Sequence, residues 1–329
     1  MTGGTEQVTS GHAALGPPVL ACGEVRTCLL PTREALDERA ALRVLDLRAD
    51  ERVRASRRPN RLVISPDLLT GVDCGLPTST GARVRGVGTV TTRAVLTEGR
   101  VLQSTASFSI PATGTDRRQA WGYYLARPGS LVTVGRLVGN PVAEGFLAGP
   151  RPGFLDVGSI AEGMLARITR HPVLDHDAPL NSTDTRLRWT STHADAGEEP
   201  SSLFTLAEDG LRTLRLRLSH GTPLTAAAVL CEDLALHDWL LTTVADRLDG
   251  LRAGSGDVRG TVKVVRPLVD HLLHLWMPRA RLDPVLHGTW NHLEETPGYS
   301  RQWSALTRRI RDQLALHAIQ LPQEVPTPR

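Results

Sequence analysis

Lysine is nearly absent from this chain of 329 residues. Of its 38 basic residues only Lys263 is a lysine, and the other 37 are arginines. A P-loop NTPase needs a lysine to hold its phosphates, and a Schiff-base enzyme needs one as its nucleophile. Lys263 lies in Gly-Thr-Val-Lys-Val-Val, which is not the P-loop pattern. The sequence therefore excludes an NTPase with its own Walker lysine.

Cysteines and long apolar runs are also scarce. The four cysteines lack Cys-x-x-Cys spacing, which argues against a zinc ribbon or a thioredoxin-type motif. The sequence contains no run of about 18 apolar residues that would span a membrane, and residues 1–16 lack the basic and apolar regions of a secretion signal. These absences predict a cytoplasmic protein with reduced thiols and no membrane association.

The composition is that of a folded protein. Hydrophobic residues make up 40% of the chain and charged residues 22%, which excludes wholesale disorder. A net charge of +3 is weak for this length and argues against nucleic acid as the main partner. The length fits one large domain or two ordinary ones.

The first half of the chain is predicted to be rich in β-strands. A flexible tail (1–18) precedes a β-rich domain (19–150) that contains one helix, which Thr32 is expected to cap. Between residues 101 and 110 apolar side chains alternate with Gln, Thr and Ser, so one face of that strand is buried. The predicted strands are 19–30, 61–65, 83–96, 101–110, 121–126 and 131–138, and a Gly/Pro-rich stretch at 139–153 marks the preferred boundary.

The second half is predicted to combine a β-hairpin with a helical bundle. Residues 151–200 form a connecting segment, with a helix at 159–170 and a polar loop at 175–200. Residues 201–321 hold a hairpin (202–207 and 211–218) followed by helices at 222–251, 258–276, 283–292 and 300–321, and a disordered tail (322–329) ends the chain. The expected fold class is α+β.

Asp233 and His237 are the candidate catalytic pair. They stand four residues apart on the long predicted helix, so the carboxylate is able to orient the imidazole as a general base requires. An ordinary pair on a helix surface has the same spacing. No Gly-x-Ser-x-Gly elbow or other nucleophile motif accompanies the pair.

Asp270, His271 and His274 are the candidate metal ligands. Positions three apart share a helix face, so two imidazoles are able to meet one metal ion, as in a metal-dependent hydrolase. Histidines at a helix interface show the same pattern, and no motif places a third ligand. The sequence predicts no organic cofactor.

Arginine and tryptophan clusters are the candidate interaction residues. Both side chains are frequent at protein interfaces, and both also stack on unpaired nucleic-acid bases. Tryptophans in the core of a helical bundle give the same count. The candidates are Arg52, Arg54, Arg57, Arg58 and Arg61, then Arg215 and Arg217 on a strand whose leucines face the core, and finally Trp276, Trp290 and Trp303.

Three segments carry a family resemblance: residues 19–30 (VLACGEVRTCLL), 81–90 (GARVRGVGTV) and 231–239 (CEDLALHDW). In these segments, and over nearly the whole chain except its two tails, the sequence resembles a protein family of unknown function from Streptomyces and related actinobacteria. The resemblance implies an accessory component encoded in a gene cluster that also holds a variant P-loop protein and a methyltransferase-like protein. It implies no catalytic residues.

The sequence therefore favours a non-enzymatic accessory subunit or adaptor of a cytoplasmic multi-protein assembly, with the variant P-loop protein as a candidate partner. Two alternatives stay open. One is a metal-dependent hydrolase that uses the helical histidine pair, and the other is a nucleic-acid-binding protein that uses the arginine clusters.

Overall fold

A mixed β-sheet of ten strands is the centre of the computed structural model, which describes residues 16–135, 139–250 and 258–320. The strand order is β2-β3-β5-β6-β1-β8-β10-β9, and β4 and β7 also pair with β5. Neighbouring strands are antiparallel except β8 and β10, which are parallel. The strands are β1 (Pro18–Leu29), β2 (Arg54–Ser56), β3 (Leu62–Ile64), β4 (Leu68–Leu76), β5 (Val84–Thr97), β6 (Val101–Pro111), β7 (Leu131–Val134), β8 (Thr185–His193), β9 (Ser201–Leu206) and β10 (Leu211–Leu218).

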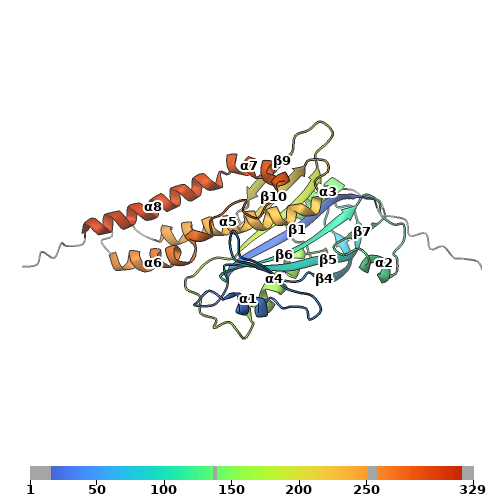
Figure 1. The fold of residues 1–329 in the computed structure, drawn as a ribbon. Helices are drawn as coiled ribbons and strands as arrows, with labels where there is room; N and C mark the ends of the chain where they lie inside the picture. The colour runs from blue at the N-terminus through green and yellow to red at the C-terminus, as the bar shows by residue number, and fades with distance from the viewer. Residues whose placement is uncertain (1–15, 136–138, 251–257, 321–329) are drawn as a thin grey trace, which may run out of the picture.

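Helices lie on both faces of this sheet (Figure 1), which confirms the α+β class. The α-helices are α1 (Glu38–Val44), α2 (Trp121–Leu125), α3 (Gly139–Leu147), α4 (Val157–Thr169), α5 (Ala227–Asp249), α6 (Val258–His271), α7 (His287–Glu295) and α8 (Tyr299–Gln320), and short 3-10 turns are η1 (Leu224–Ala226), η2 (Leu273–Leu275) and η3 (Pro284–Leu286). None of the helices in the described ranges has the length and apolar character needed to cross a bilayer.

The alternation of side chains along the central strands creates the two faces. On β1, Ala21 and Val25 pack into the apolar cluster that contains the buried side of α5, and we call this side of the sheet the α5 face. Leu20 and Cys22 point the other way and pack with Ala161 of α4, on what we call the α4 face. Successive residues of a strand face opposite sides, so the same strand builds both cores.

The predicted hairpins are confirmed. β5 and β6 form a long antiparallel pair, and β9 and β10 form a second one. The turn between β5 and β6 contains Glu98 and Gly99 with positive φ angles of 50° and 63°. On β10 Leu214, Leu216 and Leu218 are buried as expected.

Four local predictions are wrong. Residues 121–126, predicted as a strand, form helix α2, and the Gly/Pro-rich stretch at 139–153 begins with helix α3. Helix α1 begins at Glu38 and is capped by the Asp37 side chain, not by Thr32. The polar loop predicted at 175–200 contains β8, which lies between β1 and β10.

The two predicted halves share one sheet. β1 pairs with β8 from Ala21↔Ser191 to Thr27↔Thr185, so strands from both sides of residue 150 are neighbours. The polar side chains of β8 include Arg188 and Ser191, whose partners Glu24 and the Leu224 carbonyl lie far away along the chain, so the segment reads as polar in the sequence. The predicted tails at 1–15 and 322–329 lie outside the described residues.

Candidate functional site

A buried ionic cluster lies between the α5 face of the sheet and α5 itself. Its centre is Glu232 of α5, whose side chain is completely buried. Arg93 Nε donates to Glu232 Oε1 at 2.7 Å, Thr105 Oγ1 donates to the same oxygen at 2.8 Å, and Arg281 Nη2 donates to Oε2 at 3.2 Å. Burial by itself raises the pKa of Glu232, but Arg93 and Arg281 outweigh it and hold this pKa below its ordinary value. The carboxylate is therefore ionised.

The sheet register brings the partners of Glu232 together. Arg93 on β5 stands opposite Thr105 on β6, and both side chains emerge on the α5 face because they pair directly in the antiparallel ladder. Gln103, two residues earlier on β6, uses Nε2 to donate to the Glu232 carbonyl oxygen at 2.8 Å. Two strands thus hold one turn of α5.

Asp233 and His237 lie on the adjacent side of α5 and do come together. His237 Nδ1 lies 2.6 Å from the Asp233 carbonyl oxygen and 3.7 Å from Asp233 Oδ2. Because a carbonyl oxygen only accepts, Nδ1 carries the proton and Nε2 keeps its lone pair. Burial lowers the pKa of His237, with Asp233 opposing it in part, so the ring is neutral near pH 7.

The Nε2 atom of His237 is buried and has no hydrogen-bond partner among the described residues. Its ring meets Trp276 edge to face at a centroid distance of 4.9 Å. The Asp233 carboxylate, in contrast, accepts from the Arg279 backbone N–H at 3.0 Å. His237 is therefore the member of the pair that has an unused polar atom.

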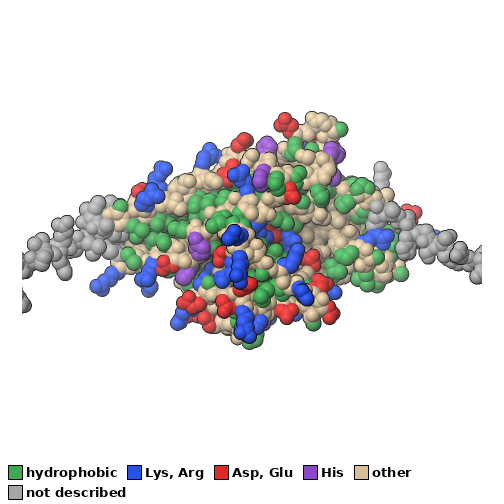
Figure 2. Space-filling model, in the orientation of Figure 1, with side chains coloured by type: hydrophobic (Ala, Val, Ile, Leu, Met, Phe, Trp, Pro, Cys, Tyr) green, Lys and Arg blue, Asp and Glu red, His purple; other side chains and the backbone are tan. Residues whose placement is uncertain are grey.

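A cavity of about 330 Å³ adjoins this cluster, and we call it the arginine cavity. Arg54 and Arg58 are exposed at its rim, and neither has an ion-pair partner within the described ranges. Three polar atoms among its lining residues, His237 Nε2, Arg281 Nη1 and Thr97 Oγ1, are buried without a hydrogen-bond partner in the described part of the chain. Figure 2 shows several basic side chains, with acidic ones among them, near the middle of the molecular face that it draws. The charged and titratable lining residues are Arg54, Arg58, Arg93, Arg281, Asp233 and His237.

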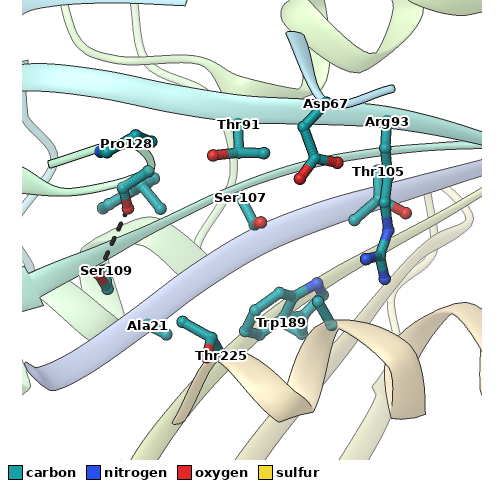
Figure 3. A pocket seen from close by; sticks show the side chains of 13 residues that line it. Ala21, Asp67, Thr91, Arg93, Thr105, Ser107, Ser109, Pro128, Trp189 and Thr225 are labelled. Carbon is teal, nitrogen blue, oxygen red and sulfur yellow. Dashed lines mark hydrogen bonds between the residues drawn. The ribbon is translucent and has the colours of Figure 1, made fainter. Parts of the chain in front are cut away.

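A second cavity of about 190 Å³ lies on the same face, and we call it the hydroxyl cavity. Figure 3 shows hydroxyl-bearing side chains along the strands, with Trp189 and Thr225 on the opposite side. The Trp189 side chain is fully buried, and its Nε1 has no hydrogen-bond partner among the residues that the structure describes. The polar lining residues are Asp67, Thr91, Arg93, Thr105, Ser107, Ser109, Trp189 and Thr225. Arg93 lines both cavities.

The metal site predicted at Asp270, His271 and His274 gains no support. His271 ends α6, and His274 lies in the separate turn η2, so the continuous helix predicted there is interrupted. Asp270 accepts from Arg266 at 3.3 Å. Across 16–135, 139–250 and 258–320, no three His, Cys, Asp or Glu side chains are placed to share a metal ion.

The predicted arginine cluster divides into two groups. Arg54 and Arg58 line the arginine cavity, whereas Arg57 pairs with Glu38 at 2.7 Å and Arg61 donates to the Glu98 carbonyl at 3.0 Å. Arg52 is exposed. On the other face of the sheet Arg215 is exposed and Arg217 pairs with Glu198 at 2.7 Å.

The predicted tryptophan surface is wrong for two of its three members. Trp290 is fully buried and Trp303 is 8% exposed, so both belong to the core under α5. Trp276 is half-buried and stacks on Trp303 with ring centroids 4.4 Å apart. Their count reflects packing between helices, as the alternative interpretation held.

Three members of the ionic cluster were missed as site residues: Arg93, Glu232 and Arg281. Glu232 carried a usable signal, because an acidic residue on the buried side of a helix must find a counter-charge. Nothing local in the sequence identified Arg93, which is 139 residues away from its partner.

Comparison with protein-family models, with curated proteins and with solved structures finds no match for this chain.

Proposed function

We propose that the protein is a non-enzymatic accessory subunit that binds a small anionic ligand in the arginine cavity. The observation that carries this proposal is a cavity lined by Arg54, Arg58 and Arg93 together with Arg281, whose buried Nη1 has no hydrogen-bond partner in the described part of the chain. A buried donor without a partner costs about 1–3 kcal/mol, and a ligand acceptor removes that cost.

The charges around the cavity support an anion. Four arginines and one aspartate line it, and Glu232 directly behind the wall neutralises one further charge, which leaves two positive charges. Guanidinium groups bind carboxylates and phosphates through two parallel hydrogen bonds, so several of them around one cavity select an oxyanion.

Calorimetric titration with inorganic phosphate and with pyrophosphate, in a phosphate-free buffer, tests this proposal. The double variant Arg54→Gln/Arg58→Gln removes two exposed cavity arginines and is expected to weaken binding at least tenfold. The matched control is Arg52→Gln/Arg57→Gln, which makes the same charge change in the same segment outside the cavity lining. Equal weakening by both variants, or no binding by the unmodified protein, contradicts the proposal.

A second candidate role, as an adaptor in a cytoplasmic assembly with the variant P-loop protein as partner, is supported by strand β9. β9 is at the end of the sheet order, carries no charged residue, and exposes Leu203 and Leu206 at 59% and 62%. Edge strands without charges are prone to pair with other chains.

Co-elution of the two purified proteins in size-exclusion chromatography tests the adaptor role. Leu203→Lys/Leu206→Lys is expected to abolish co-elution. Leu125→Lys, at an exposed leucine of α2, serves as the control and is expected to leave it intact. Separate elution of the unmodified proteins contradicts this role.

A further inference from the structure

The hydroxyl cavity contains polar groups that the fold itself does not use. The hydroxyls of Thr91, Ser107 and Thr225 make no hydrogen bond to any described residue, and they line the same cavity. The buried Trp189 Nε1 lies among these lining residues and is also without a partner in the described ranges. Thr105 differs, because its hydroxyl is committed to Glu232 at 2.8 Å.

These groups match the hydrogen-bonding pattern of a polyol. Serine and threonine hydroxyls both donate and accept, an indole N–H donates, and the carboxylate of Asp67 accepts. A sugar hydroxyl needs such mixed partners, because each one is itself a donor and an acceptor. The cavity of about 190 Å³ equals the volume of about six water molecules at ~30 Å³ each, so it suits a small polar group.

Arg93 joins this cavity to the arginine cavity. Its Nε is committed to Glu232, whereas its two Nη atoms make no hydrogen bond to a described residue. The Arg93 side chain is 21% exposed, and it lines both cavities. A ligand in either cavity therefore meets the same guanidinium group.

We infer that the ligand is a phosphorylated polyhydroxylated molecule, a sugar phosphate or a nucleotide. Its phosphate lies in the arginine cavity, its hydroxyl-bearing part lies in the hydroxyl cavity, and Arg93 contacts it where the two parts join. This inference rests on the proposed anion binding. A phosphate monoester carries a charge of about −1.5 to −2 at pH 7, which balances the two positive charges that remain around the arginine cavity.

The test compares five probes by calorimetry on the full chain: inorganic phosphate, ribose, ribose 5-phosphate, AMP and, as a carboxylate control, citrate. Ribose 5-phosphate is expected to bind at least tenfold tighter than phosphate, and ribose alone is expected to bind weakly. If AMP binds more tightly than ribose 5-phosphate, the ligand is a nucleotide. If AMP binds equally or more weakly, the ligand is a sugar phosphate.

Two variants sharpen the test, one in the hydroxyl cavity and one control outside it. Thr91→Val/Ser107→Ala removes two unused hydroxyls and is expected to reduce ribose 5-phosphate binding to the level of phosphate, with phosphate binding unchanged. The matched control is Thr92→Val, the next residue on β5, whose buried hydroxyl lies on the α4 face and lines neither cavity. It is expected to leave both affinities within twofold.

The outcomes separate this inference from the function on which it rests. If phosphate binds but the pentose adds no affinity, or if Thr92→Val acts as strongly as Thr91→Val/Ser107→Ala, the inference is wrong and anion binding stands. If citrate binds as tightly as ribose 5-phosphate, the ligand is a carboxylate and the inference is again wrong. If none of these anions binds, the proposed function fails as well.

Discussion

The two faces of the sheet each bury one glutamate between two arginines, but only the cluster around Glu232 has a buried guanidinium nitrogen without a hydrogen-bond partner in the described part of the chain. On the α4 face Arg188 donates to Glu24 through Nε and Nη2 at 2.9 and 2.7 Å, and Arg26 donates to the other carboxylate oxygen at 3.1 Å. The remaining Arg188 nitrogen donates to the Phe146 carbonyl at 3.1 Å. All three guanidinium nitrogens are thus used.

The cluster around Glu232 on the α5 face is incomplete by comparison. Arg281 Nη1 is buried without a partner in the described ranges, and Arg93 lines two cavities. The same set of charges, one glutamate and two arginines, therefore occurs in two different environments. Arg188, whose three nitrogens all have acceptors, holds the layers together, whereas the free donors beside Glu232 are the ones that the proposed ligand would use.

The largest expected effect comes from breaking the saturated cluster. Arg188→Met removes four hydrogen bonds, two to Glu24 and one each to Asp156 and the Phe146 carbonyl. It leaves Glu24 undercompensated, which is expected to lower the free energy of unfolding by about 3–5 kcal/mol. Urea denaturation followed by tryptophan fluorescence measures this loss.

Arg186→Met is the control for that variant. Arg186 lies two residues earlier on β8 and pairs with the exposed Asp209, so its loss is expected to cost less than about 1 kcal/mol. Similar losses for the two variants contradict a structural role that is special to the Glu24 cluster.

Neutralising Glu232 is expected to separate stability from binding. Glu232→Gln weakens hydrogen bonds to two arginines and is expected to cost about 1.5–3 kcal/mol of stability. It also leaves an extra positive charge beside the arginine cavity, so phosphate is expected to bind several-fold tighter.

The same substitution on the other face, Glu24→Gln, is the matched comparison. It is expected to lower stability without changing phosphate affinity, because Glu24 lines neither cavity. Calorimetry and urea denaturation on both variants measure the two effects. Weaker phosphate binding by Glu232→Gln runs against the proposed role of the cavity.

Filling the space beside Glu24 tests how tightly that cluster is packed. A Cβ on Gly158 of α4 would lie 2.5 Å from Glu24 Oε1, so Gly158→Ala is expected to destabilise by about 1–3 kcal/mol. In Gly163→Ala, on the exposed side of the same helix, the added Cβ meets nothing within 4 Å, and the variant is expected to be stabilised by about 0.5–1 kcal/mol. Thermal unfolding measures the change in stability of both variants, and changes of the same sign contradict the prediction.

The smallest expected effect is the pH dependence contributed by His237. Burial lowers its pKa in the folded state, so below its ordinary value of 6.5 the unfolded chain binds this proton more readily than the folded one. The free energy of unfolding is therefore expected to fall on acidification from pH 7 towards pH 5, by at most about 1.4 kcal/mol per pH unit.

Urea denaturation of His237→Gln at several pH values isolates that contribution. Its pH slope over this interval is expected to be shallower than that of the unmodified protein. His292→Gln, at an exposed histidine of α7, is the control and is expected to keep the original slope. Unchanged slopes for both variants show that His237 does not titrate in this window.

Local patterns predicted a large share of the fold. The Asp233–His237 spacing correctly placed both residues on one side of a helix. The alternation at 101–110 wrongly predicted that only one face of β6 is buried, because Gln103, Thr105 and Ser109 are buried on the other face. Patterns failed where a partner lies far along the chain. Arg188 made β8 read as a loop, because the Glu24 that neutralises it is 164 residues away.

The sequence by itself determined the α+β class and the central hairpins, because these depend on the spacing of apolar residues over a few positions. Only the tertiary structure decided which charged side chains are saturated and which remain free. Both glutamates look alike in the sequence. Their environments differ because Gly158 of α4 packs directly against the Glu24 carboxylate and Arg188 uses all of its guanidinium nitrogens, whereas Arg281 Nη1 beside Glu232 has no partner in the described ranges.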